Sequence, residues 1–199
     1  KNPGFKITPA LIQHGLYALE FGDIFLRCLY RMRPYEVTPG SANALHEKWK
    51  ERVIAFVTQD GFLSHRKYKQ MCRQIIRDFD CLPITDEKKP RVGVVGEILV
   101  KYHPAANNDV VTLLESEGAE AVVPDLTDFL LYCCYNQIYK ADNLGESKKT
   151  ARLNKMLIRF FEWLRKDARD TLAKSKHFEP TCYIENTAKN AESIVSIGN

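Results

Sequence analysis

The fold is decided by the stretch from Lys89 to Pro124, KPRVGVVGEILVKYHPAANNDVVTLLESEGAEAVVP. It opens with the short apolar run Val92 to Val95, whose β-branched residues predict a strand buried on both faces. A second short strand is expected at Ala121 to Val123, just before the proline. The residues between the strands have a helical pattern, so we expect a parallel, right-handed βαβ unit.

The helix between these strands has recognisable ends. Asn107 or Asn108 is placed to cap its first turn, because an Asn side chain accepts hydrogen bonds from free backbone N–H groups. Its apolar positions lie between Val110 and Leu114, and Gly118 is placed to end it in the left-handed conformation. We therefore expect a helix-rich α/β fold built around a small parallel sheet.

The loop after the first predicted strand is the first candidate for a functional site. Ligands of open α/β sheets bind outside the carboxyl ends of the strands, and a helix start offers free N–H groups and a partial positive charge. The loop therefore predicts a site for a phosphate or carboxylate, such as an acyl-CoA. Alternatively, Glu97 and Lys101 pair with neighbouring helices and are structural. The candidate ligand-binding residues are Gly96, Glu97, Lys101, Tyr102, His103 and Asn107.

Composition excludes two kinds of partner. The formal net charge of +4 is too small and too dispersed to indicate nucleic-acid binding. No apolar run approaches the roughly 20 residues needed to cross a bilayer, so no membrane partner is expected. The chain begins with neither an initiator Met nor a signal peptide. We therefore expect a piece of a longer, cytoplasmic protein.

The cysteines and the known catalytic motifs give no complete site. No two cysteines have a CxxC spacing, so we expect free thiols and no metal in this segment, unless residues outside it supply ligands for an iron–sulfur cluster. The sequence contains no GxGxxG, GxxxxGK[ST], GxSxG or HExxH motif. The six cysteines are Cys28, Cys72, Cys81, Cys133, Cys134 and Cys182.

Helical patterns fill the first 85 residues. Thr8-Pro9 predicts the start of a helix that continues to about Met32, and two more helices are expected, at about 43–57 and after a Ser64 cap. Pro34 and Pro39-Gly40 predict a rigid loop after the first helix. This loop has a second candidate functional role, because it presents Arg33, Tyr35 and Glu36.

The residues after Pro124 also predict helices, at about 127–139, 147–174 and 187–195. Residues 147–174 form a basic, amphipathic pattern that suits a membrane surface. Three acidic residues interrupt the basic face, however, so an ordinary solvated helix is the preferred interpretation: Glu162, Asp167 and Asp170. We accordingly divide the chain into a helical region, 1–85, which packs on an α/β lobe, 86–199.

Two parallel strands alone leave an unpaired edge on each side. Either helices cover those edges, or further strands follow the segment in a longer chain. We favour the second alternative, in which the sheet is incomplete in this fragment and the lobe is truncated at its C-terminus.

Two motifs resemble a known family. They are RPYE, Arg33 to Glu36, and PRVGVVGEILVKYHPAANNDVVTLLESEGAEAVVPDLTDFLLY, Pro90 to Tyr132. Both resemble the large, multi-domain activators of 2-hydroxyacyl-CoA dehydratase, also called CoA-substrate-specific enzyme activases. More narrowly, they resemble the dehydratase-like region that follows the ATPase domains in those proteins.

The resemblance implies a role in anaerobic bacterial acyl-CoA metabolism and a Rossmann-like lobe. In such proteins an ATP-hydrolysing activator with an iron–sulfur cluster passes single electrons to a dehydratase. A [4Fe-4S] cluster and ATP are thus implied for the longer parent protein, and no cofactor is expected in this segment. The implied partners are the remaining domains of the parent chain and a dehydratase subunit.

Three functions therefore remain in view. The leading one is a lobe of an activator/dehydratase-like protein without a complete catalytic site of its own. A nucleotide- or CoA-binding oxidoreductase domain is the second, although the missing GxGxxG motif counts against it. The third is a protein-interaction module that uses the arginine-rich helix and three tyrosines, Tyr132, Tyr135 and Tyr139.

Overall fold

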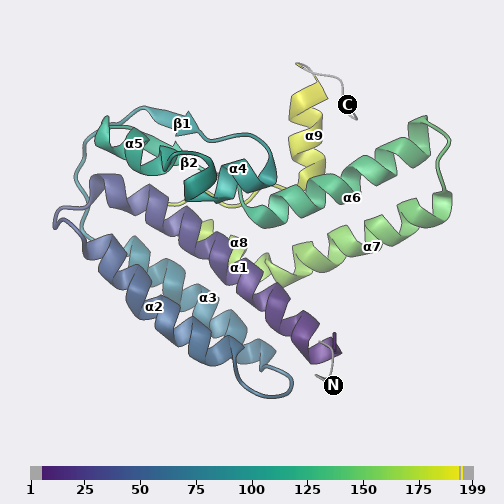
Figure 1. Cartoon of the computed structure of the whole chain (residues 1–199), viewed down its shortest axis with the longest axis horizontal. Coiled ribbons are helices and arrows are strands. Elements are labelled where there is room, and N and C mark those ends of the chain that lie inside the picture. The colour runs from purple at the N-terminus through teal and green to yellow at the C-terminus, as the bar shows by residue number, and fades with distance from the viewer. Residues whose placement is uncertain (1–5, 193, 195–199) are drawn as a thin grey trace.

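The computed structural model describes residues 6–192 and 194 and is dominated by helices around one small sheet (Figure 1). Three helices, α1–α3, lie together, and the two strands lie above α1 with the short helices α4 and α5. A hairpin of α6 and α7 extends to one side. The elements in the first half are α1 (Pro9–Met32), η1 (Arg33–Tyr35), α2 (Ser41–Val57) and α3 (His65–Asp80). Those that follow are β1 (Arg91–Gly93), α4 (Ile98–Tyr102), η2 (Pro104–Ala106), α5 (Val110–Ser116), β2 (Glu120–Val122), α6 (Leu126–Asn143), α7 (Lys148–Leu164), α8 (Lys166–Leu172) and α9 (Ile184–Glu192).

The first and third helices begin where the sequence predicts, and α2 begins at Ser41, two residues before its predicted start. The Thr8 hydroxyl accepts a hydrogen bond from the Leu11 N–H at 3.2 Å, and Pro9 occupies the first position of α1. Ser64 caps α3 in the same way, through the Lys67 N–H. The apolar stripe predicted for α3 is buried along its whole length, so this prediction is confirmed: Tyr68, Met71, Cys72, Ile75, Ile76 and Phe79.

The largest hydrophobic core joins α1, α2 and α3 with α8. Phe21, Phe56 and Tyr68 pack edge to face at its centre. Leu164, at the end of α7, and Leu172 of α8 belong to this same core. The second half of the chain thus contributes to the core of the first. The division into 1–85 and 86–199 stays a prediction.

The two strands are parallel, as predicted, with Arg91 opposite Glu120 and Gly93 opposite Val122. The expectation of a first strand buried on both faces is wrong. All three residues of β1 are exposed, and Val95, which lies beyond its end, is 80% exposed. The reason is that, among the described residues, β1 pairs only with β2, while α1 and α5 pack against β2.

The connection between the strands contains more helix than expected. The predicted loop Gly96 to Pro104 holds the single-turn helix α4, because the Glu97 carboxylate caps its first turn. The start of α5 follows the prediction in part. Its flanking residue is Asp109, but the Asn107 amide oxygen accepts the hydrogen bond from the Val110 N–H, at 3.3 Å. Gly118 follows α5 with φ +81°, the left-handed conformation predicted for it.

The helix predicted at 147–174 is two helices. α7 ends at Leu164, and α8 begins at Lys166, after Arg165 adopts φ −86° and ψ 0°. The backbone turns there because Arg165 is held in a buried network while α8 packs against α3. α9 begins at Ile184, three residues before its predicted start, and the predicted end at Val195 lies outside the described residues.

Within the described part of the chain, no helix combines the length and the apolar character that a bilayer span requires.

Candidate functional site

The carboxyl ends of β1 and β2 meet at one edge of the sheet, where the sequence predicts a site. α4 lies after β1, and the segment Pro124–Asp125 follows β2. The Tyr102 hydroxyl of α4 donates a hydrogen bond of 2.6 Å to the Pro124 carbonyl oxygen. This bond joins the loop after one strand to the loop after the other.

Most predicted ligand-binding residues have contacts within this loop. Gly96 has φ +146°, a conformation that favours glycine. The Glu97 carboxylate accepts hydrogen bonds from the N–H groups of Leu99, at 2.8 Å, and Val100, at 3.4 Å. Its capping role leaves it fewer sites for a ligand. Whether Glu97 binds a ligand or is only structural stays a prediction.

Three of the four remaining predicted residues line a small cavity. Lys101 places its ammonium group 4.8 Å from the centre of the Tyr102 ring. The Asn107 amide donates a weak hydrogen bond of 3.5 Å to the Lys101 carbonyl oxygen, and His103 is exposed. Lys101, Tyr102 and Asn107 line a cavity of about 40 Å³. That volume suits a single water molecule, so an acyl-CoA would have to bind over this surface rather than inside it.

Three carboxylates are close enough to Tyr102 to act on its hydroxyl group. Burial raises the pKa of the Tyr102 hydroxyl, and the charges of Asp23, Asp125 and Asp128 raise it further. The edge of the sheet therefore combines one lysine, Lys101, with a group of acidic residues that act on the Tyr102 hydroxyl.

Asp125 is the central acidic residue of this group. It follows β2 directly after Pro124, and its carboxylate pairs with the Arg27 guanidinium of α1 at 2.8 Å. Burial raises its pKa to about 7, against the lowering effect of Arg27, and the Asp23 carboxylate adds to the increase.

Asp23 and Glu20 extend the acidic group along α1. The Asp23 carboxylate accepts hydrogen bonds from the N–H groups of Leu126, at 2.7 Å, and Thr127, at 2.9 Å, and so caps α6. Glu20 accepts a hydrogen bond of 3.1 Å from the Thr127 hydroxyl. Burial, together with the charge of Asp23, raises the pKa of Glu20 to about 8. A neutral Glu20 is therefore favoured at neutral pH.

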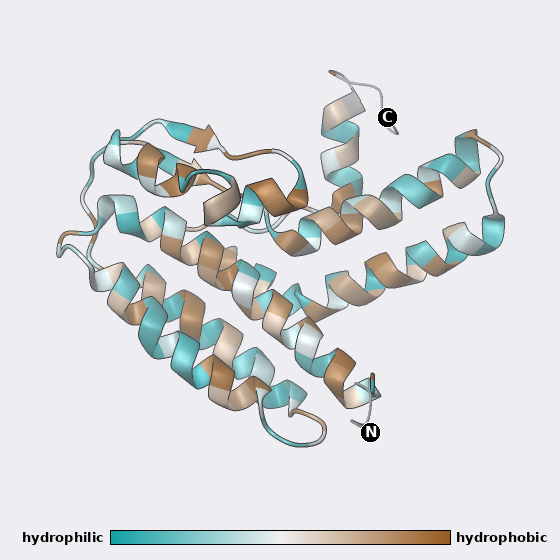
Figure 2. Ribbon diagram, viewed as in Figure 1, coloured by the Kyte–Doolittle hydropathy of each residue, from teal (hydrophilic) through white to brown (hydrophobic). Residues whose placement is uncertain are grey.

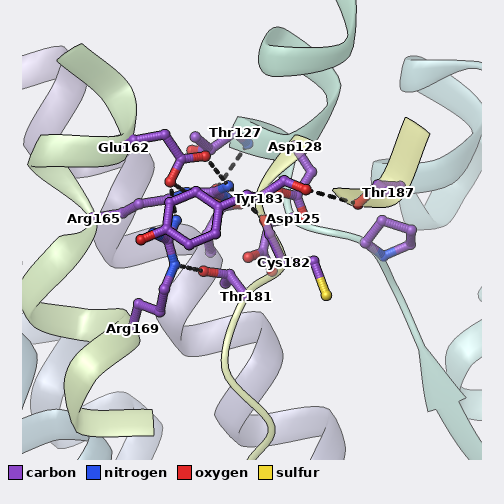
Figure 3. A network of polar contacts seen from close by, with 12 residues as sticks. Asp125, Thr127, Asp128, Glu162, Arg165, Arg169, Thr181, Cys182, Tyr183 and Thr187 are labelled. Carbon is purple, nitrogen blue, oxygen red and sulfur yellow. Dashed lines mark hydrogen bonds and ion pairs between the residues drawn. The ribbon is translucent and has the colours of Figure 1, made fainter. Parts of the chain in front are cut away.

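Two buried arginines complete the network (Figure 3). Arg165 donates hydrogen bonds to Asp128 at 2.6 Å, to Glu162 at 2.7 Å and to the Cys182 carbonyl oxygen at 3.0 Å. Arg169 also pairs with Glu162, and its guanidinium carbon lies 3.9 Å from the centre of the Tyr183 ring. The network leaves a cavity of only about 20 Å³, which is too small for an organic ligand.

The residues of the RPYE loop face the protein and hold its parts together. Arg33 donates two hydrogen bonds to the Glu115 carboxylate, at 2.7 and 2.9 Å. The Tyr35 hydroxyl donates to Glu120 at 2.8 Å. Glu36 accepts hydrogen bonds from the backbone N–H groups at the start of α2, including Ala42 at 2.8 Å. The rigid loop is present as the short helix η1, and its three candidate residues have structural partners.

Glu120 of β2 collects several of these contacts. It is buried, and it pairs with Arg31 of α1 and with Arg91 of β1, the latter at 3.1 Å. Arg31 also donates to the His177 carbonyl oxygen at 3.0 Å. We call Arg31, Tyr35, Arg91 and Glu120 the Glu120 cluster. It ties α1, η1 and both strands into one unit.

The sequence interpretation missed the acidic group. Asp125 had a usable signal, because it stands directly after the second predicted strand, at the same edge as the loop after the first. Glu20 and Asp23 also had one, since they interrupt an otherwise apolar stripe of α1. Nothing in the pattern around Arg165 distinguishes it from the exposed arginines of the same segment.

The cysteines do not gather into a site for the cluster that the resemblance implies for the parent protein. Cys28 and Cys72 are fully buried in the first core, and burial raises the pKa of both thiols. Among the described residues, no group of three or more His, Cys, Asp or Glu side chains is placed to hold a metal ion.

Comparisons with family models, with curated proteins and with solved structures found no significant match to this chain.

Proposed function

We propose that this chain is a lobe of an activator/dehydratase-like protein of 2-hydroxyacyl-CoA metabolism and has no complete catalytic site of its own. One observation carries the proposal. The two motifs of the resemblance contact each other, since Arg33 of RPYE binds Glu115 and Tyr35 binds Glu120 of the ESEGAE segment. Because these motif side chains already form hydrogen bonds with one another, they support a scaffold role better than a catalytic one.

The small sheet is consistent with this role. In the proposal, β1, β2 and the helices between them belong to a Rossmann-like lobe, which the rest of a longer cytoplasmic parent chain completes. ATP and a [4Fe-4S] cluster would be held by other domains of that parent, and a dehydratase subunit would be its partner. An acyl-CoA would meet this lobe at the sheet edge, where Lys101 is the nearest cation among the predicted loop residues.

The test compares the 199-residue chain with its longer parent, both purified without oxygen. We expect ATP hydrolysis and iron–sulfur absorption from the parent alone. Either property in the 199-residue chain, or the lack of iron–sulfur absorption in the parent, would contradict the proposal.

Calorimetric titration of the 199-residue chain separates this proposal from an oxidoreductase domain. We expect no binding of NAD(H), NADP(H) or FMN, and weak binding of CoA that Lys101→Gln reduces. Lys48→Gln, an exposed lysine of α2, serves as the matched control and should leave CoA binding unchanged. Tight binding of a nicotinamide or flavin cofactor would favour the oxidoreductase instead.

A further inference from the structure

One side of α7 exposes a row of large apolar side chains. Leu153 is 52% exposed, Met156 60%, Phe160 39% and Trp163 52%. Their spacing of three, four and three residues places them along one line of the helix. We call these four residues the α7 stripe. Figure 2 shows the brown, apolar segments that α7 carries along the projecting hairpin. Single exposed apolar residues are common, but a continuous row of four indicates an interaction surface.

A row of cations lies beside the stripe. Arg152, Lys155 and Arg159 each precede a stripe residue by one position, which places them about 100° around the helix from it. All three are exposed, and none forms an ion pair with any of the described residues. α7 therefore carries an apolar row and a basic row side by side.

The acidic residues that interrupt this basic pattern in the sequence lie elsewhere in the structure. Glu162 turns inward and pairs with Arg165 and Arg169. Asp167 and Asp170 belong to α8, beyond the break at Arg165, and Asp167 pairs with Lys69 of α3 at 2.8 Å. The reason for treating α7 as an ordinary solvated helix is thereby removed.

The position of the α7 stripe favours a single helix over a lipid bilayer as its partner. Trp163, at its inner end, stacks on His65 of α3 with the ring centres 4.7 Å apart. From there α7 extends away from α1 at an angle (Figure 1). The stripe thus begins against the helical body, which would hold a flat bilayer away from its inner end. A single helix could lie along its whole length.

We propose that the α7 stripe docks an acidic, amphipathic helix of a protein partner. Apolar residues at helical spacing would cover the four stripe side chains, and carboxylates on one flank would pair with Arg152, Lys155 and Arg159. The proposal goes beyond the function given above, because it requires neither the acyl-CoA system nor the sheet edge.

The experiment uses the 199-residue chain and a labelled synthetic peptide of 17 residues, the length of α7. The peptide has Leu at helical spacing and Glu along one flank. Binding is measured by fluorescence anisotropy, and contact with the stripe by acrylamide quenching. Quenching reports on Trp163, because the other tryptophan, Trp49, is buried. We expect saturable binding that weakens with added salt and protects Trp163 from acrylamide.

Two stripe variants and one control sharpen the result. The charge reversal Arg152→Glu/Lys155→Glu/Arg159→Glu should weaken binding by about ten-fold or more, and Leu153→Ser/Met156→Ser should do the same. Both change exposed residues, so circular dichroism should show an intact fold. The control carries the same change of charge on exposed cations outside α7, Lys48→Glu/Arg77→Glu/Lys174→Glu, and should keep the affinity within about two-fold.

Several results would overturn the proposal. It fails if the peptide does not bind, if the control reversal weakens binding as much as the stripe reversal, or if a peptide with Lys in place of Glu binds equally well. It also fails if vesicles of phosphatidylcholine and phosphatidylserine, rather than the peptide, protect Trp163. The surface would then be a membrane-binding face.

Discussion

Burial disfavours the charged form of the Glu20 carboxyl group. It is buried between Thr127, which donates a hydrogen bond to it, and the negative charge of Asp23. Asp125, close by, is kept partly ionised by Arg27. Burial raises the pKa of both acids, and only at Asp125 does an arginine in direct contact oppose the increase.

The raised pKa of Glu20 predicts how the stability of the fold changes with pH. The pKa of Glu20 is raised from 4.5 to about 8, so the folded chain keeps a proton that the unfolded chain loses between these values. The free energy of unfolding should therefore fall as the pH rises from about 4.5 to 8, by at most about 1.4 kcal/mol per pH unit for this group. Urea denaturation across this range measures the slope.

Glu20→Gln should flatten the dependence, because the amide oxygen can accept the Thr127 hydrogen bond without ionising. Glu51→Gln, on the exposed side of α2, is the control and should keep the original slope. Equal slopes in both variants would show that Glu20 does not titrate as described. A slope that remains in Glu20→Gln would belong to Asp23 and Asp125, whose pKa values are also raised by burial.

A second prediction concerns Glu120. Glu120→Gln removes a buried charge that faces Arg31, Arg91 and Tyr35. We expect the free energy of unfolding to fall by about 2 kcal/mol. This is less than the cost of breaking a fully buried ion pair, because both arginines are partly exposed. Glu179→Gln removes the other partner of Arg91, at an exposed site, and should cost less than about 0.5 kcal/mol. Chemical denaturation compares the two, and equal costs would refute the central role of Glu120.

At the scale of the elements, short-range sequence signals predicted several helix ends but not the features that depend on distant residues. Thr8-Pro9, Ser64 and Gly118 act within one turn of their own helix and have the predicted roles, and Asn107 has its predicted role in part. The break at Arg165 could not be predicted, because it depends on Asp128 and Cys182, which are distant in sequence. The exposure of β1 also has no local signal, since a run of valines is equally compatible with a buried or an edge strand.

Replacing glycine with alanine should have opposite effects on stability at two positions. Gly118→Ala forces a side chain into the left-handed conformation and should destabilise the chain by about 1 kcal/mol. Gly15→Ala, in the exposed middle of α1 with nothing within 4 Å of the added methyl group, should stabilise it by about 0.5–1 kcal/mol. Thermal unfolding measures both, and a loss in both variants would contradict the conformational explanation.

For the whole molecule, helix content, the parallel strand pair and their order could be predicted from sequence, but the way the halves join could not. The acidic group and the Glu120 cluster bring together residues from both halves. Each contact depends on the position of complete helices, which no local pattern records. The sequence therefore predicts which residues lie at this edge of the sheet, but not the acidic residues that come close to them, and the site itself stays a prediction.

The shared core allows a test of the division into 1–85 and 86–199. Leu172→Ala removes a buried side chain of α8 from the core of α1–α3 and should cost about 2–4 kcal/mol. If the chain unfolds as one unit, amide hydrogen exchange in α6 should accelerate together with that in α3. Leu153→Ala, at an exposed position, should change neither. Acceleration confined to α3 would support two independent domains.

The pairs that join the halves also affect the order of folding. Arg31 and Glu120 are 89 positions apart, and Arg27 and Asp125 are 98 apart, whereas α2 and α3 are neighbours in the chain. Closing such long loops costs entropy that nearby helices do not have to overcome. We expect the three-helix assembly to form early and the electrostatic links between the halves to form late, so that arginine-to-glutamine changes in those links alter the unfolding rate more than the folding rate.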